Sequence, residues 1–134
     1  MEYVAWEKKY KSNIALIDSQ HQILFNIINN LFDAMKFGKG NEIIGEILNE
    51  LVSYTDYHFN AEENLMKENQ YVNLDSHLKA HKEFVQKVLF FYQRYISKES
   101  ALSIDIIDFL KDWLISHILT MDLEFTRTIK ADTN

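Results

Sequence analysis

The chain contains no proline and only three glycines among its 134 residues. Folds rich in strands turn about every 8 to 12 residues, usually at glycine or proline. This shortage of turn residues therefore favours long helices. The composition, 47% hydrophobic and 25% charged, is that of one ordinary globular domain, so we expect a single domain over residues 1–134.

Charge and apolar patterning exclude several classes of partner. The net charge is −6 and the longest basic cluster is Lys8, Lys9 and Lys11, so nucleic acid is not an expected partner. No window approaches the roughly 18 to 20 apolar residues of a membrane helix, and the first residues lack the apolar stretch of a signal peptide. Cysteine is absent, which excludes disulfides and thiolate metal sites. We therefore expect a cytoplasmic protein that does not enter a membrane.

Four segments repeat apolar residues at spacings of three and four, which is typical of helices with one buried face. They cover residues 18–37, 41–69, 74–97 and 103–129. The residues expected to cap their N-termini are Asp18 or Ser19, Asn41, Asn73 or Asp75, and Ser103. Links of only a few residues make each helix run antiparallel to the one before it. The sequence therefore predicts an all-α, up-down-up-down four-helix bundle over residues 18–130, preceded by an N-terminal arm, residues 1–17.

The five histidines and two of the acidic residues converge in this bundle. A helix rises about 1.5 Å per residue, so all seven fall within one slab about 15 Å thick near one end. They are His21, His58, Glu62, His77, His81, His117 and Asp122. A lone histidine on an apolar face is more often a hydrogen-bonded core residue than a ligand. Seven such groups in one slab are better explained as ligands, because buried carboxylates without partners would be costly.

Helix geometry places two pairs of these residues on common faces. His58 with Glu62, and His77 with His81, are four residues apart and about 40° from alignment. His117 and Asp122 are five apart, about 140° from alignment in an ideal helix. Either Asp122 reaches the site from the flank, or a local π-type turn realigns the two side chains.

Seven ligands are too many for one zinc ion, which takes four, so two metal ions suit the count better. Two bridging carboxylates and a bridging solvent oxygen would leave one metal with six ligands and the other with five. Imidazole and carboxylate ligands suit iron, manganese or zinc better than Cu(I). Such a centre would have one open position for a small ligand.

The motifs that hold these residues resemble those of the hemerythrin family, and most closely its single-domain bacterial members. The resemblance covers essentially the whole chain and includes the five-residue step before Asp122. The matching motifs are Asp18-Ser19-Gln20-His21, the segment from His58 to Glu63, the segment from His77 to His81, and the segment from Trp113 to Asp122.

The resemblance implies a centre of two iron ions bridged by oxo or hydroxo. It assigns His77, His81 and His117 to the iron whose coordination positions are all filled, which we call the full iron. It assigns His21 and His58 to the iron with one free position, the open iron. Glu62 and Asp122 would bridge the two. The resemblance further implies that dioxygen binds reversibly at the open iron, for oxygen transport, storage or delivery rather than catalysis. Nitric oxide or azide could occupy the same position. We also expect a monomer.

The resemblance also identifies Leu114 as the leucine of the oxygen pocket. Helix phase adds Phe25, Phe59 and Ile118 as neighbours of that pocket.

Three other functions are compatible with such a bundle. One is a di-iron redox enzyme, although the Glu-x-x-His pairs of ferritin-like enzymes are absent. Another is a module that senses oxygen or redox state for a partner. The third is a structural dizinc bundle.

Overall fold

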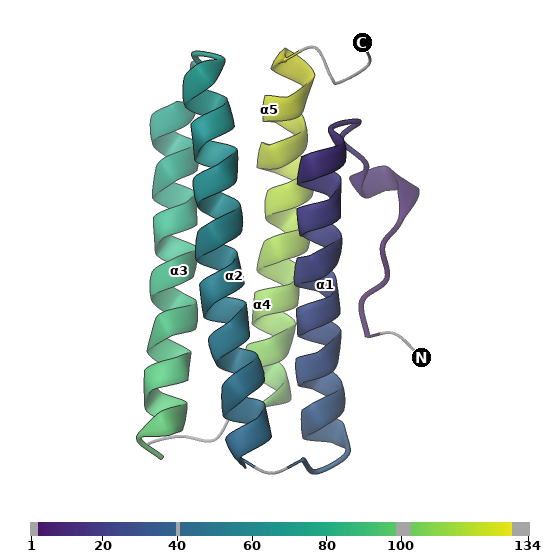
Figure 1. Ribbon diagram of the computed structural model, residues 1–134, viewed down its shortest axis with the longest axis vertical. Helices are drawn as coiled ribbons and strands as arrows, with labels where there is room; N and C mark the ends of the chain where they lie inside the picture. Colours follow the sequence, from purple (N-terminus) through teal and green to yellow (C-terminus); the bar gives the residue numbers. More distant parts are fainter. Residues whose placement is uncertain (1–2, 40, 99–102, 130–134) are drawn as a thin grey trace.

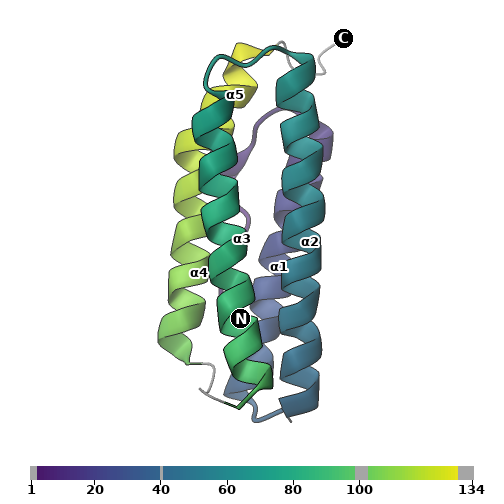
Figure 2. The same ribbon diagram turned by 90° about the vertical axis from the view of Figure 1, so that its left-hand side faces the viewer.

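The computed structural model describes residues 3–39, 41–98 and 103–129. Long helices pack side by side, and consecutive helices run in opposite directions (Figure 1). The elements are η1 (Lys8–Tyr10), α1 (Ala15–Lys36), α2 (Asn41–Glu68), α3 (Leu74–Ile96), α4 (Ile104–His117), η2 (Ile118–Asp122) and α5 (Leu123–Thr128). The last three form one continuous rod, so the predicted all-α four-helix bundle is confirmed. Figure 2 shows α3 between α4 and α2, with α1 behind.

The start of α1 differs from its prediction. The helix begins at Ala15, with Ile14 at the N-cap position, so the prediction of a cap at Asp18 or Ser19 was wrong. The Asp18 carboxylate is instead used in a tertiary contact, because it accepts hydrogen bonds from the backbone N–H of Ser12 at 2.9 Å and from its hydroxyl at 2.7 Å. These bonds tie the arm to the first turn of α1.

Of the other predicted caps, the one at Ser103 is confirmed and the one at Asn73 lacks its hydrogen bond. Ser103 caps α4 as predicted, since its side chain accepts a bond from the N–H of Ile106. Asn73 occupies the N-cap position of α3 without a side-chain cap bond. Some predictions fall on residues that the structure does not describe. They are the cap at the side chain of Asn41, both ends of the predicted domain, and the last predicted residue of the bundle, 130.

The N-terminal arm lies along the outer side of α1 (Figure 1). The side chain of Asn29 on α1 holds the arm at Val4, accepting from its backbone N–H and donating to its C=O, both at 2.8 Å. The ring of Tyr3 stacks on Phe32 with centroids 4.1 Å apart. The arm is therefore packed on the bundle by backbone hydrogen bonds and by aromatic contact.

The apolar core consists of two clusters of buried residues. The larger contains buried residues of α1, α2, α3 and α4, among them Leu31, Leu48, Val88 and Leu110. The smaller lies where α2 ends and α3 begins and contains Met66, Tyr71 and Phe125. Within the described residues, no helix is both long and apolar enough to span a bilayer.

Candidate metal centre

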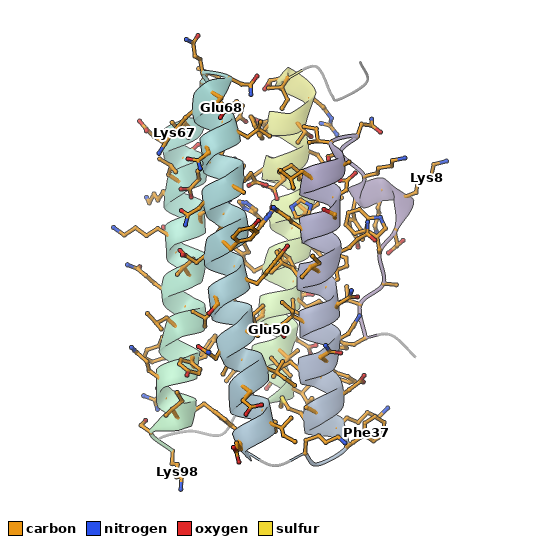
Figure 3. The ribbon with its side chains drawn as sticks, in the orientation of Figure 1. Lys8, Phe37, Glu50, Lys67, Glu68 and Lys98 are labelled. Carbon is orange, nitrogen blue, oxygen red and sulfur yellow. The ribbon has the colours of Figure 1, made fainter. Side chains whose placement is uncertain are left out.

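All seven predicted site residues lie in the bundle interior, and none is more than 3% exposed. His21 comes from α1, His58 and Glu62 from α2, His77 and His81 from α3, His117 from α4, and Asp122 from the end of η2. In Figure 3, Glu50 and Lys67 mark the part of α2 that includes both of its site residues. The polar layer therefore lies in the upper half of the bundle, as that figure is drawn.

The seven side chains form two groups that share their carboxylates. In each group, one potential ligand atom from every residue lies within 4.8 Å of all the others. The larger group is Glu62, His77, His81, His117 and Asp122, and the smaller is His21, His58, Glu62 and Asp122. The two groups therefore hold three and two imidazoles.

The five-residue step from His117 to Asp122 is accommodated by a π-helical turn. Residues Ile118–Asp122 form η2, which is π-helical and adds the extra residue to that turn. The turn brings Asp122 Oδ1 to 3.1 Å from His117 Nε2. Of the two possibilities that the sequence left open, the structure has the π-type turn.

Three ring nitrogens meet at one point of the larger group. Nε2 of His117 is 2.9 Å from Nε2 of His81 and 3.1 Å from Nε2 of His77. Metal–imidazole bonds of about 2.1 Å place neighbouring nitrogens about 3.0 Å apart at 90° and about 3.4 Å apart in a tetrahedron. The observed spacing fits the octahedral angle.

Each carboxylate faces both groups. Asp122 directs Oδ1 to His77 Nε2 at 2.9 Å and Oδ2 to His21 Nε2 at 3.0 Å. Glu62 directs Oε1 to His81 Nε2 at 3.0 Å, while Oε2 lies 3.5 Å from His58 Nε2. Two oxygens of one carboxylate that serve two donor clusters have the arrangement of a bridging ligand.

Burial and ion pairing compete in setting the pKa values. Burial alone would lower the pKa of His21 and His77, but the adjacent carboxylates of Asp122 and Glu62 outweigh it and raise each pKa to about 9. At His58 burial dominates and lowers the pKa to about 4. Burial alone would raise the pKa of both carboxyls, but the neighbouring imidazoles hold each pKa well below its ordinary value. A metal cation would replace the protons on these imidazoles, because ligand imidazoles must be neutral.

The hydrogen bonding of the buried polar atoms also fits a pair of metal ions. Several buried polar atoms here lie near other donor atoms of the site but form no hydrogen bond of regular geometry among the described residues, which is rare for buried polar groups. They include Nε2 of His21 and of His58, both carboxylate oxygens of Glu62, and Oδ2 of Asp122. The unpartnered atoms are concentrated where a cation would bind.

Comparison with known proteins agrees with this geometry. The family model of the hemerythrin HHE cation binding domain matches residues 12–129. The chain belongs to the hemerythrin family. It is 32% identical over 130 residues to a bacteriohemerythrin of Pseudomonas aeruginosa, covering 97% of this chain and 84% of that protein. It is 30% identical over 120 residues to the myohemerythrin of Sipunculus nudus, covering 90% and 88% of the two chains.

Solved structures of hemerythrins share the fold. A wild-type hemerythrin superimposes with a TM-score of 0.90 at 26% identity, covering 96% of this chain and 99% of the other. A hemerythrin variant with leucine replaced by alanine superimposes with a TM-score of 0.92, also at 26% identity. The likeness therefore extends over nearly the full length of each chain.

Two residues of this hemerythrin domain contact the imidazoles on the side away from the proposed metal ions, and the sequence alone predicted no role for them. Nδ1 of His58 lies 2.7 Å from Oε1 of Gln20, and Nδ1 of His81 lies 2.9 Å from Oε2 of Glu63. An acceptor at Nδ1 leaves Nε2 free to bind metal and increases its basicity. The only sequence signal was their position beside His21 and Glu62 in the quoted motifs.

Aromatic rings cover the imidazoles on several sides. Phe59 stacks on His81 with centroids 3.7 Å apart, and Trp113 stacks on His117 at 4.6 Å. Trp6 of the arm lies 6.4 Å from His21. These rings separate the polar layer from solvent.

The four predicted pocket residues are all buried, but they have different neighbours. Phe59 contacts the three-imidazole group, whereas the ring of Phe25 packs against Trp6 of the arm at 5.6 Å. Ile118 directly follows His117, and Leu114 lies one turn before it on α4. Their role as a pocket stays a prediction.

Proposed function

We propose that this chain binds dioxygen reversibly at a pair of iron ions and serves to carry, store or deliver oxygen. Hemerythrins are oxygen-binding di-iron proteins, and the family membership supports the proposal. The observation that carries it is the unequal number of imidazoles around two shared carboxylates. The proposed ligands are His77, His81 and His117 for one iron, His21 and His58 for the other, and Glu62 and Asp122 for both.

The unequal ligand count creates a place for a small molecule. With both carboxylates and an oxo or hydroxo bridge, the three-imidazole iron would have six ligands and the two-imidazole iron would have five. A ferrous pair supplies the electrons that dioxygen binding requires. The open position therefore belongs to the side of His21 and His58, and nitric oxide or azide is expected to compete there.

The protein's own contribution is to keep this position dry. The imidazoles are covered by Phe59, Trp113 and Trp6, and the polar atoms of Gln20 and Glu63 are already directed at ring nitrogens. An apolar gas enters such a shell at less cost than an anion or a polar substrate, because it loses no hydration. We propose that Leu114, Phe25, Phe59 and Ile118 line its path and its binding position.

The same shell is the reason to propose a binding protein rather than an enzyme. Turnover of bound oxygen requires protons, electrons or a co-substrate at the metal pair. The aromatic side chains around the imidazoles offer none of these. We therefore expect bound oxygen to leave as oxygen.

The visible spectrum of the iron-loaded protein tests this function. Protein reduced under argon should be colourless, develop the absorption of an oxo-bridged ferric pair in air, and lose it again on purging. A colour that appears once and resists purging would contradict reversible binding. Co-purified zinc without colour would contradict the iron centre and favour a structural dizinc bundle.

A further inference from the structure

A buried hydroxyl group lies one helical turn from His58, a proposed ligand of the open iron. Thr55 on α2 is only 1% exposed, and its Oγ1 has no hydrogen-bond partner among the described residues. A buried hydroxyl without a partner loses the hydrogen bonds that water would give it, so such groups are uncommon.

Thr55 differs in this respect from most hydroxyl residues of the bundle. Serine and threonine in helices usually return their hydroxyl to a carbonyl in the preceding turn. Six described residues do so, whereas Thr55 does not bond to a carbonyl of α2. The six are Ser19, Ser76, Ser97, Thr120, Thr126 and Thr128.

The register of the bundle places Thr55 beside the ligand position. Thr55 precedes His58 by three residues on α2, just as Leu114 precedes His117 by three residues on α4. The two helices run in the same direction (Figure 1), so both residues lie about 4.5 Å from their histidine toward the same end. Thr55 therefore shares a layer with the predicted pocket leucine.

Apart from His58, the buried residues of α2 next to Thr55 are apolar. The residues one turn to either side of Thr55 on the buried face of α2 are Leu51 and Phe59. The nearest buried polar residue to Thr55 on α2 is His58, a proposed metal ligand, one turn away. His58 belongs to the two-imidazole group and hence to the side of the proposed open position.

We propose that the Thr55 hydroxyl donates a hydrogen bond to a small ligand at the two-imidazole iron. The inference rests on the proposed di-iron function. The hydroxyl favours ligands with an acceptor atom, such as azide or dioxygen that has gained negative charge. A threonine hydroxyl is too weak an acid to release its proton, so it stabilises a ligand without converting it. Thr55 would therefore determine which ligands bind and how long oxygen stays.

Azide binding to the oxidised, iron-loaded protein tests this inference. Thr55→Val keeps the side-chain shape and removes the hydroxyl, and Thr55→Ser keeps the hydroxyl. We expect Thr55→Val to weaken azide about tenfold, as for the loss of one hydrogen bond to a charged acceptor, and Thr55→Ser to bind like the wild type. Equal azide affinity in all three proteins would overturn the proposal.

Two further measurements separate the possible failures. The infrared stretching band of bound azide should differ between the wild type and Thr55→Val, since a hydrogen bond changes that frequency; identical bands would overturn the proposal. Metal-free Thr55→Val should unfold at the wild-type urea concentration or higher, because valine removes an unpartnered buried hydroxyl. A wild type without iron or an azide band would overturn the di-iron function and Thr55 together, whereas identical azide binding in the wild type and Thr55→Val would overturn Thr55 alone.

Discussion

Replacing Asn29 with alanine should release the N-terminal arm from the bundle. The Asn29 side chain pairs with both the N–H and the C=O of Val4, each at 2.8 Å. Val4 is 6% exposed, so little water reaches these backbone groups once the amide is gone. Two lost hydrogen bonds of about 0.5 to 1.5 kcal/mol each lower the free energy of unfolding by about 1 to 3 kcal/mol.

Asn30→Ala is the matched control for this variant. Asn30 is the next residue of α1 and is exposed, so its replacement changes only helix propensity, which alanine improves by about 0.5 kcal/mol. Both variants share that gain, and their difference isolates the contacts with Val4.

Urea unfolding of the metal-free protein measures the difference. A loss of about 2 kcal/mol with a slope of about 2 kcal/mol per molar lowers the midpoint of Asn29→Ala by about 1 M relative to Asn30→Ala. The arm also carries Trp6 to 6.4 Å from His21, so reduced, iron-loaded Asn29→Ala should oxidise faster in air. Equal midpoints for the two variants would refute the view that the arm is part of the cooperative fold.

Three further predictions concern the metal centre. Glu63→Gln should weaken iron retention against a chelator by about 10- to 100-fold, because it removes the negative charge of the acceptor 2.9 Å from Nδ1 of His81, whereas Glu68→Gln on the same helix should not; equal retention would contradict this. Leu114→Ser should speed the loss of oxygenated protein to the ferric state, measured as the decay of its spectrum, and an unchanged rate would argue against a dry pocket. The metal-free chain should lose stability between pH 6.5 and about 9, because a pKa raised in the folded state to about 9, as at His21, contributes stability that disappears as the proton leaves. Urea midpoints that stay flat over this range would contradict that reasoning.

Much of the fold followed from regular spacing. The apolar repeats and the short links predicted four antiparallel helices, and the fixed rise of a helix predicted that His21, His58, His77 and His117 would lie at one level. Spacing could not decide how Asp122 reaches this level, because a π-type turn depends on tertiary contacts that outweigh local helix geometry.

The features that the sequence did not reveal depend on tertiary contacts, which the local helix pattern does not encode. Asp18 resembled a helix cap, but its carboxylate accepts a hydrogen bond from Ser12 of the arm, and the helix already begins at Ala15. Gln20 precedes His21 and Glu63 follows Glu62, and both look like surface residues in the sequence. Each of them nevertheless contacts an imidazole of another helix. Such contacts appear only when the helices are placed side by side.

The most direct test of the oxygen-binding proposal is the oxygen stoichiometry of the iron-loaded protein. Two iron ions per chain should take up one dioxygen molecule, and a purge of inert gas should return it as dioxygen, detected by mass spectrometry with isotopically labelled gas. Labelled oxygen that is consumed and recovered as water or peroxide would contradict reversible binding at this centre.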